Sequence, residues 1–217
     1  MIIVGICGAS GSGKSTLAKR IAGSLACSCE IIGQDCYYIN HPDLPFEQRV
    51  HINYDEPGAF DYEEIIADIK TLTSGQPVTK KGYDYVGHLR ADTDELIAPP
   101  EVLIMEGIHI FHNPALCAMM SLKVYMHVDI DVCLLRRIKR DIKLRGRTID
   151  NIAAQYIETV KPMYETYIMN YISDADFAIM RGGKNKMAID AISAYLTTKV
   201  LAERFERERA VQLTIDN

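Results

Sequence analysis

The glycine-rich stretch at residues 5–16, GICGASGSGKST, constrains the fold more than any other feature of this sequence. It contains the spacing G-x-x-x-x-G-K-S, which ends at Ser15. A short apolar run, Ile2–Cys7, precedes it, and apolar residues recur at helical spacing over residues 14–25. A glycine loop between a buried strand and a helix is the context that a phosphate-binding loop requires. The sequence therefore predicts an α/β fold that binds a nucleoside triphosphate.

The residue types of this loop suit a polyphosphate. Backbone N–H groups can point toward an anion only where no Cβ intrudes, and the helix that follows adds N–H donors and a positive dipole end. Lys14 brings a positive charge to the β- and γ-phosphates, and the Ser15 hydroxyl can ligate Mg²⁺. The predicted nucleotide-binding residues are Gly8, Ala9, Ser10, Gly11, Ser12, Gly13, Lys14, Ser15 and Thr16.

Apolar runs and amphipathic segments alternate along the chain, which favours a parallel sheet with helical crossovers. We expect strands at residues 2–7, 29–35, 102–107, 122–129 and 176–180. Helices are expected at 14–25, between Asp61 as N-cap and Gly75, after a cap at Asp131, at about 150–172 and at 185–201. The chain is interpreted as a single domain, 1–217, with a β-hairpin insertion at about 78–97, a lid at about 136–150 and a charged C-terminal helix at about 202–211.

Composition narrows the classes of function. The 217 residues have a formal net charge of −5, so the chain as a whole has no basic footprint for nucleic acid or an anionic membrane. Its apolar runs are far shorter than the roughly 20 residues of a membrane span, and no signal peptide is recognised. Six cysteines without a CxxC pair are expected to be reduced thiols of a cytoplasmic protein. We expect small-molecule partners, and neither nucleic acid nor membrane.

Two acidic residues are expected at the ends of neighbouring strands. Asp35 ends the second predicted strand, and Glu106 ends the third. In an open parallel sheet, ligands gather at the carboxyl ends of the strands. A carboxylate there can hold Mg²⁺ or accept a proton from an attacking hydroxyl. Either residue could instead be a helix cap or a solvated turn acid.

A basic cluster, RRIKRDIKLRGR at 136–147, holds seven of the chain's 24 lysines and arginines. Leu135, Ile138 and Ile142 are predicted to face the core, so that the charges project from the opposite face. A solvated helix face is one interpretation. The other is an arginine-rich lid that closes over phosphates and stabilises the transition-state charge. We favour the lid, because like charge at this density is costly without an anion.

Other motifs are weaker. The segment NKMA at 185–188 lacks the aspartate of a guanine-binding NKxD motif, and no buried strand leads into DEPG at 55–58. A switch GTPase is therefore not favoured. His109 and His112 stand three residues apart without a further ligand cluster, so a surface or core-edge position is expected rather than a metal site.

Together these residues resemble the uridine kinase (uridine–cytidine kinase) family of P-loop kinases. The resemblance covers about residues 2–195 and rests on the segments GQDCYY, NYDEPGAFD, YDYVGHLR, LIMEGI, RRIKRDIKLRGRTIDNIAAQYIETVKPMY and RGGKN, in the family's order and spacing. It implies the P-loop NTPase/nucleoside-kinase fold: an α/β five-stranded parallel sheet flanked by helices, with a small β-hairpin insertion and an arginine-rich lid.

The resemblance also implies roles for individual residues. Asp35 matches the base that takes the proton from the ribose 5′-hydroxyl and lies next to Mg²⁺. Asp55 matches the acid that binds the ribose hydroxyls, and His88 would read the base edge. The implied catalytic residues are Asp35, Lys14, Arg140 and Arg145, and the implied metal ligands are Ser15, Asp35 and Glu106. The implied substrate-binding residues are Tyr54, Asp55, Tyr83, Tyr85, His88, Ile108, Arg137, Arg147 and Gln155.

The reaction implied by the resemblance is transfer of the γ-phosphate of ATP or GTP to the 5′-hydroxyl of uridine or cytidine, with Mg²⁺ as cofactor. Two alternatives stay open: a related kinase acting on nicotinamide riboside, pantothenate or a phosphoribulose, and a nucleotide-binding switch without turnover. The segment 83–88 favours a pyrimidine, since a nucleobase needs an aromatic face and hydrogen-bond partners. A homo-oligomer, often a tetramer in this family, is implied by resemblance.

Overall fold

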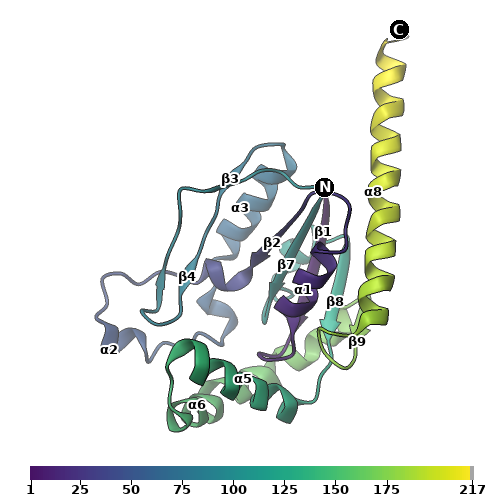
Figure 1. The fold of residues 1–217 in the computed structure, drawn as a ribbon. Coiled ribbons are helices and arrows are strands. Elements are labelled where there is room, and N and C mark those ends of the chain that lie inside the picture. The colour runs from purple at the N-terminus through teal and green to yellow at the C-terminus, as the bar shows by residue number, and fades with distance from the viewer. Residues whose placement is uncertain (216–217) are drawn as a thin grey trace.

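A parallel sheet of five strands forms the centre of the protein. We describe a computed structural model, which covers residues 1–215. The strands lie side by side in the order β2 (Cys29–Gly33), β7 (Val102–Gly107), β1 (Ile2–Gly8), β8 (Leu122–Met126) and β9 (Phe177–Ile179) (Figure 1). Each neighbouring pair is parallel, as the sequence predicted. All five strands therefore end at one edge of the sheet.

Helices cover both faces of the sheet. Alternate residues of β1 point to opposite sides, so that Ile2, Val4 and Ile6 join one core and Ile3 and Cys7 join the other. The first core is closed by α1 (Lys14–Ala22) and α8 (Lys186–Ile215), and the second by α3 (Tyr62–Thr73) and α4 (Pro114–Ala118). Burial on both faces explains why the central strands are almost continuously apolar.

The predicted hairpin insertion is present as two short ladders. The strands β3 (Val78–Thr79) and β6 (Leu96–Ile97) pair antiparallel near its base, and β4 (Tyr83–Asp84) pairs with β5 (Leu89–Arg90) toward its tip. In Figure 1 this arm lies beside α3, on the side of the sheet away from α8. Its tip leans toward α2 (Phe46–Arg49) and the loop that ends in η2 (Pro57–Ala59).

Several predicted boundaries differ from the observed ones. The second strand stops at Gly33, and Asp35 lies in the 3₁₀ turn η1 (Gln34–Tyr37). The helix α1 ends at Ala22 rather than near residue 25. Asp61 does cap α3, accepting a hydrogen bond from the Glu64 N–H at 2.8 Å. Asp131 is not the cap of the basic helix, because β8 ends early and the helix already begins at Ile130, after Asp129.

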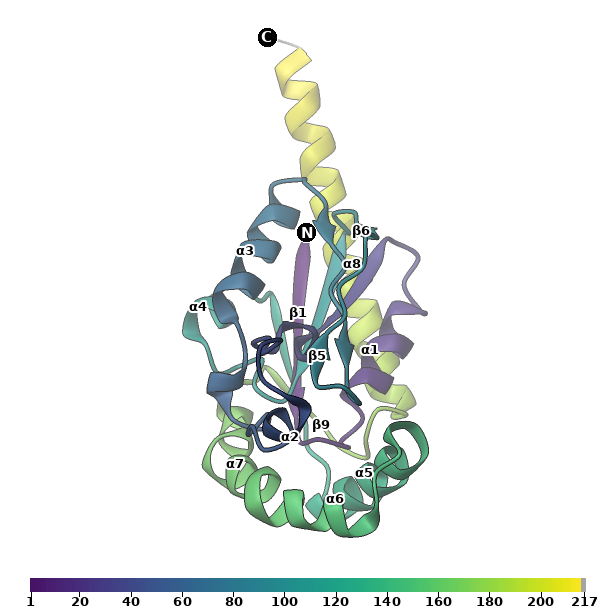
Figure 2. The same cartoon turned by 90° about the vertical axis from the view of Figure 1, so that its left-hand side faces the viewer.

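The helix predicted at about 150–172 is interrupted. It consists of α6 (Ile149–Gln155), a π turn η3 (Tyr156–Val160), α7 (Lys161–Thr166) and the 3₁₀ segment η4 (Ile168–Asp174). Pro162 explains the change of helix type, since it has no N–H for the ordinary bond four residues back. Figure 2 shows α5 (Ile130–Arg145), α6 and α7 crossing the carboxyl ends of the strands.

The inward face of α5 is not the one that the sequence predicted. Of the apolar residues expected to face the core, Leu135 and Ile142 have side chains that are 60% and 48% exposed. Cys133, Arg137 and Asp141, which recur every fourth residue, are buried instead. The physical reason is the position of α5, which crosses the polar carboxyl edge of the sheet rather than packing on an apolar face. The basic cluster thus turns part of its charge inward.

The C-terminal helix α8 is a single helix of 30 residues, so the charged segment at about 202–211 continues the preceding helix. Its distal part projects past the rest of the protein (Figures 1 and 2). Arg204 anchors the point of departure through a bidentate pair with Glu101, at 2.6 and 2.7 Å. Within residues 1–215, no helix is both long and apolar enough to cross a membrane.

Candidate active site at the carboxyl edge of the sheet

The glycine loop lies where β1 passes into α1. Gly13 precedes the helix with a φ of +101°, a backbone conformation that favours glycine. A Cβ on Gly13 would also come within 2.9 Å of the Gly183 nitrogen, so the RGG segment packs directly on the loop. The Lys14 ammonium donates to the carbonyls of Gly8 and Ala9, at 3.0 and 3.1 Å, and lies over the mouth of the loop. This is the arrangement of a polyphosphate cradle.

The two predicted carboxylates lie beside this loop. Gly33 is paired with Glu106 in the sheet, which places Asp35 and Glu106 at the same edge. The Ser15 hydroxyl donates to Glu106 Oε1 at 2.6 Å. Burial, with help from the charge of Asp35, raises the pKa of Glu106, although Lys14 and the Ser15 hydroxyl oppose the shift. A half-buried carboxylate beside the phosphate cradle is a suitable ligand for a cation.

These oxygen donors fit Mg²⁺. One hydroxyl and two carboxylates, from Ser15, Asp35 and Glu106, match an ion that is commonly held by one or two carboxylates and by substrate phosphates. The described residues contain no group of three or more His, Cys, Asp and Glu side chains that could form a complete protein cage. Ser15, Asp35 and Glu106 also line one cleft of about 460 Å³ with Lys14, Arg140 and Arg145.

A second, smaller pocket adjoins this cleft and shares several lining residues with it, Asp35 among them. Its walls come from the glycine loop, η1, the loop before η2, the hairpin, the residue after β7, the lid and the end of α6. It contains every residue that the family resemblance implied for substrate binding, which are Tyr54, Asp55, Tyr83, Tyr85, His88, Ile108, Arg137, Arg147 and Gln155. It also contains two of their neighbours that were not expected there, Ser10 and Tyr38. Sequence segments up to 145 residues apart thus meet in one cavity, which we call the acceptor pocket.

The hairpin contributes the aromatic wall of the acceptor pocket. The rings of Tyr54 and His88 stack with centroids 5.0 Å apart and an interplanar angle of 24°. His88 has a φ of +53°, which is strained for a residue other than glycine and places its ring at the tip of the turn. Burial lowers the pKa of His88, and Arg147, Arg145 and Arg49 lower it further. Its Nδ1 is buried without a hydrogen-bond partner among the residues that the structure describes, so it can serve a ligand.

Asp55 forms the polar floor of the acceptor pocket. Its carboxylate accepts a hydrogen bond from the Thr159 hydroxyl at 3.0 Å and lies 3.7 Å from the Arg137 guanidinium. Gln155 connects the same network to the lid, since its Oε1 accepts from Arg137 at 2.8 Å and from Arg147 at 2.6 Å. Gln155 and Thr159 are four residues apart, so both face Asp55 from adjoining helical turns.

The lid arginines share one counter-ion that sequence reasoning missed. Asp141, in the middle of α5, is completely buried and pairs with Arg140 at 2.7 Å, Arg145 at 3.3 Å and Arg137 at 3.6 Å. Burial acts to raise the pKa of Asp141, but the hydrogen bond from Arg140 and the three positive charges outweigh it and lower the pKa. The single acid within the basic run at 136–147 was the available signal.

The lid contacts both halves of the site. Arg137 and Arg140 donate to the Ser10 hydroxyl of the glycine loop, at 3.1 and 3.4 Å. The Arg145 guanidinium lies 4.0 Å from the centre of the Tyr85 ring, and the Tyr85 hydroxyl donates to Asp35 at 2.8 Å. Tyr85 was expected to line a base pocket, and the structure places it between the catalytic candidate Asp35 and the lid.

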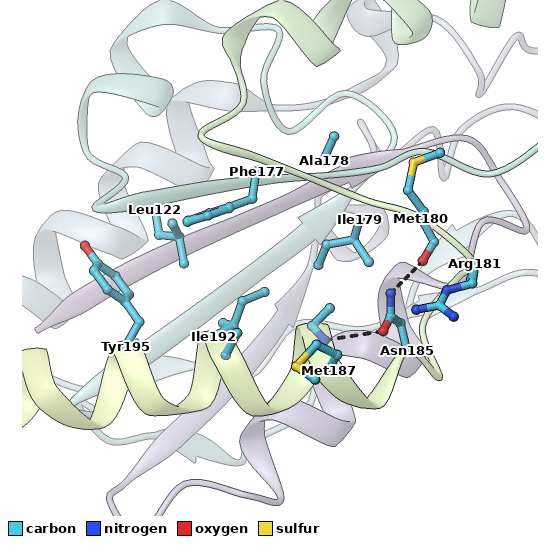
Figure 3. A pocket seen from close by; sticks show the side chains of 12 residues that line it. Leu122, Phe177, Ala178, Ile179, Met180, Arg181, Asn185, Met187, Ile192 and Tyr195 are labelled. Atoms are coloured by element: carbon cyan, nitrogen blue, oxygen red, sulfur yellow. Dashed lines mark hydrogen bonds between the residues drawn. The ribbon is translucent and has the colours of Figure 1, made fainter.

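Another hollow lies beside the outermost strand of the sheet, between β9 and α8, with a volume of about 440 Å³ (Figure 3). Phe177, Ile179, Ile192 and Tyr195 project into it, and the hydrogen bond from Asn185 to the Met180 carbonyl closes one end. Its lining is almost wholly apolar and contains neither a carboxylate nor any residue of the glycine loop. It therefore does not belong to the phosphate site.

The fold and the site together define the class of protein to which this chain belongs. A glycine-loop cradle, two carboxylates at neighbouring strand ends, an arginine lid and an adjoining acceptor pocket are the features of P-loop phosphotransferases. Residues 3–188 match the model of the phosphoribulokinase / uridine kinase family. The chain belongs to this family.

Individual relatives agree with this assignment. A uridine kinase of Ligilactobacillus salivarius is 40% identical over 209 residues, which is 96% of each chain. A uridine kinase of Staphylococcus epidermidis is 42% identical over 199 residues, 91% of this chain and 94% of its own. The structure of a phosphoribulokinase from Rhodobacter spheroides has a TM-score of 0.57 over 82% of this chain and 69% of its own. At 16% identity, that last likeness concerns the fold alone.

Proposed function

We propose that this protein is a uridine/cytidine kinase, which transfers the γ-phosphate of ATP or GTP to the nucleoside 5′-hydroxyl and forms UMP or CMP. The observation that carries the proposal is the acceptor pocket, where Asp35, Asp55 and His88 lie in one cavity beside the phosphate cradle. A pyrimidine nucleoside presents a hydroxyl to activate, two ribose hydroxyls and a base edge. The relatives named uridine kinases support the same acceptor class.

In the reaction that we propose, the 5′-oxygen attacks the γ-phosphorus as its proton passes to the Asp35 carboxylate. The bond from the γ-phosphorus to the bridging oxygen breaks, and the nucleoside diphosphate leaves. Lys14, Arg140 and Arg145 stabilise the charge on the transferred group. When bound at Ser15, Asp35 and Glu106, Mg²⁺ would neutralise phosphate charge.

Binding of the acceptor falls to the remaining residues of the pocket. Asp55 and Gln155 are assigned to the ribose hydroxyls. Tyr83 and His88 are assigned to the base edge, and Tyr54, stacked on His88, to the flat surface beside the base. The acceptor pocket has a volume of about 60 Å³ and is continuous in its lining with the neighbouring cleft of about 460 Å³, so the two together offer the roughly 300–1,000 Å³ of small-molecule sites.

A panel of acceptors tests this function. Purified protein with MgATP or MgGTP would be incubated with uridine, cytidine, nicotinamide riboside, pantothenate and ribulose 5-phosphate, and the products separated by chromatography. We expect UMP and CMP, and Asp35→Asn as the matched inactive control. Phosphorylation of another acceptor without formation of UMP or CMP would contradict the proposal.

Two further properties belong to the proposal. We propose a cytoplasmic location, which the six unpaired cysteines support. We also propose a homo-oligomer, a tetramer by family resemblance. Exposed apolar side chains such as Phe177, Met187 and Phe205 are of the kind that subunit contacts cover. Light scattering on the purified protein would measure the mass, and a monomer at micromolar concentration would contradict this part.

A further inference from the structure

A buried histidine lies directly behind the acceptor pocket. The sequence predicted a surface or core-edge position for His109, but its side chain is 0% exposed. Its Nε2 lies 2.6 Å from the main-chain carbonyl oxygen of Asp55, and its Nδ1 lies 3.0 Å from the Tyr171 hydroxyl. His112 Nδ1 lies 3.0 Å from the same hydroxyl. A buried polar chain thus runs from the back of Asp55 toward the exposed His112.

The direction of each hydrogen bond in this chain can be assigned. A carbonyl oxygen only accepts, so His109 Nε2 carries the proton. Burial lowers the pKa of His109 to about 4. The hydrogen bond to the Asp55 carbonyl acts to raise this pKa, and the charges of His112 and Lys14 act to lower it. The ring is therefore neutral near pH 7. His109 Nδ1 then accepts from the Tyr171 hydroxyl. The Tyr171 oxygen accepts from His112, whose Nδ1 must carry a proton.

The main chain of His109 is held as firmly as its ring. Its N–H donates to the Oε1 of the fully buried Gln34 at 2.9 Å, and its carbonyl accepts from the Tyr62 hydroxyl at 3.1 Å. Gln34 is the chain neighbour of Asp35. His109 therefore connects the turn that carries the proposed base to the loop that carries the proposed ribose ligand.

The loop around Asp55 needs such a connection. Residues 51–56 lie between α2 and η2 and belong to no helix or strand. The Asp55 N–H is bound locally, by the Asn53 side chain at 3.0 Å. The hydrogen bond from His109 joins this irregular loop to the end of β7, which is part of the rigid sheet.

We propose that His109 is a positioning residue for the acceptor pocket: by holding the Asp55 carbonyl from behind, it keeps the Asp55 carboxylate directed at the ribose. This inference rests on the proposed function, since it assigns Asp55 to the ribose hydroxyls. It concerns substrate binding rather than chemistry, because the His109 ring does not line the acceptor pocket.

Two substitutions at one position separate positioning from packing. His109→Leu fills similar volume but removes the donor, which leaves a buried carbonyl unpaired. His109→Gln keeps an N–H donor at about the reach of Nε2. We expect the KM for uridine to rise about tenfold in the Leu variant, with the KM for ATP changed less than about twofold. In the Gln variant, the KM for uridine should stay within about threefold of the wild-type value. Tyr171→Phe removes the donor to His109 Nδ1 and also the acceptor for His112, and it should give an intermediate KM for uridine.

Hydrogen exchange of the peptide covering residues 50–59 provides a readout without nucleoside. We expect this peptide to exchange faster in His109→Leu and at the wild-type rate in His109→Gln. An unchanged uridine KM in the Leu variant, equal rises in both KM values, or a Gln variant as impaired as Leu would overturn the proposal. If wild type phosphorylates neither uridine nor cytidine, the proposed function fails, and unchanged exchange in the Leu variant would separately refute the positioning of Asp55.

Discussion

At the scale of single residues, the fold places Asp35 where the proposed reaction needs a base. It lies in the turn just beyond β2, within the cleft that the glycine loop lines, and it receives a hydrogen bond from Tyr85. A nucleoside hydroxyl has a pKa far above 7, so its attack needs a carboxylate within reach. The phosphate cradle, by contrast, is built from main-chain N–H groups and Lys14. Proton transfer and nucleotide binding are thus assigned to different groups.

We therefore expect Asp35→Asn to lose about 10²–10⁴ in kcat while it binds ATP nearly as wild type does. Steady-state kinetics with uridine, together with calorimetric titration of ATP, would measure the two effects. Asp43→Asn, in an exposed loop, is the matched control. Normal turnover by Asp35→Asn would show that another group accepts the proton.

His88 offers a second test at this scale. Its strained backbone, its stacking on Tyr54 and its unpaired Nδ1 all point to recognition of a ligand. We expect His88→Ala to raise the KM for uridine and cytidine about tenfold or more, with a smaller effect on the KM for ATP. His41→Ala, outside the acceptor pocket, is the control. A uridine KM equal to that of wild type would remove His88 from the base site.

At the scale of elements, α5 functions as a unit because its arginines share Asp141. Three guanidinium groups on one helix would repel one another, and the buried carboxylate compensates them while they also contact Ser10 and Gln155. Ion pairs within the protein therefore hold the arginines of α5 in place, and these arginines touch both the glycine loop and the acceptor pocket. This arrangement allows occupancy of one half of the site to affect the other.

We expect Asp141→Asn to lower the free energy of unfolding by up to about 3–5 kcal/mol, since it leaves buried positive charge without its partner. Chemical denaturation would measure this loss, and limited trypsin digestion would show faster cleavage within residues 136–147. Asp131→Asn, on the exposed first turn of the same helix, should behave as wild type. A variant within about 0.5 kcal/mol of wild type would show that the arginines do not depend on Asp141.

At the scale of the whole molecule, the buried polar chain behind the acceptor pocket affects stability. The pKa of His109 is about 4 in the folded protein, against about 6.5 in the unfolded chain. Between these values the unfolded state binds a proton that the folded state does not. The contribution of His109 is therefore complete above about pH 6.5 and declines as the pH falls toward 4. The pKa of Glu106 is raised on folding, so its contribution to the pH dependence of stability has the opposite sign.

Between pH 7 and about pH 5, we expect the free energy of unfolding to fall by about 1–2 kcal/mol more in wild type than in His109→Gln. Denaturant titrations of both proteins at the two pH values would give this difference, in which other titrating groups cancel. His127→Gln, at an exposed position, should show the wild-type dependence. Parallel losses in wild type and His109→Gln would mean that His109 does not resist protonation in the folded state.

The sequence by itself determined the class of fold and the phosphate cradle. Local signals were sufficient there: the glycine spacing after Ile2–Cys7, the apolar strands that need cover on both faces, and Asp61 as the cap of α3. The family resemblance also brought nine substrate-binding candidates, and they meet in one pocket. Their roles with the nucleoside stay predictions.

Only the tertiary structure decided which neighbours those residues have. Periodicity predicted that Leu135 and Ile142 face inward, but α5 crosses a polar edge, so Arg137 and Asp141 are buried there. The ring of His109 meets the backbone of Asp55, a residue 54 positions earlier, and no local pattern encodes that contact. Periodicity shows which residues share a face of an element. The chemistry of the surface that the face meets depends on how distant segments pack.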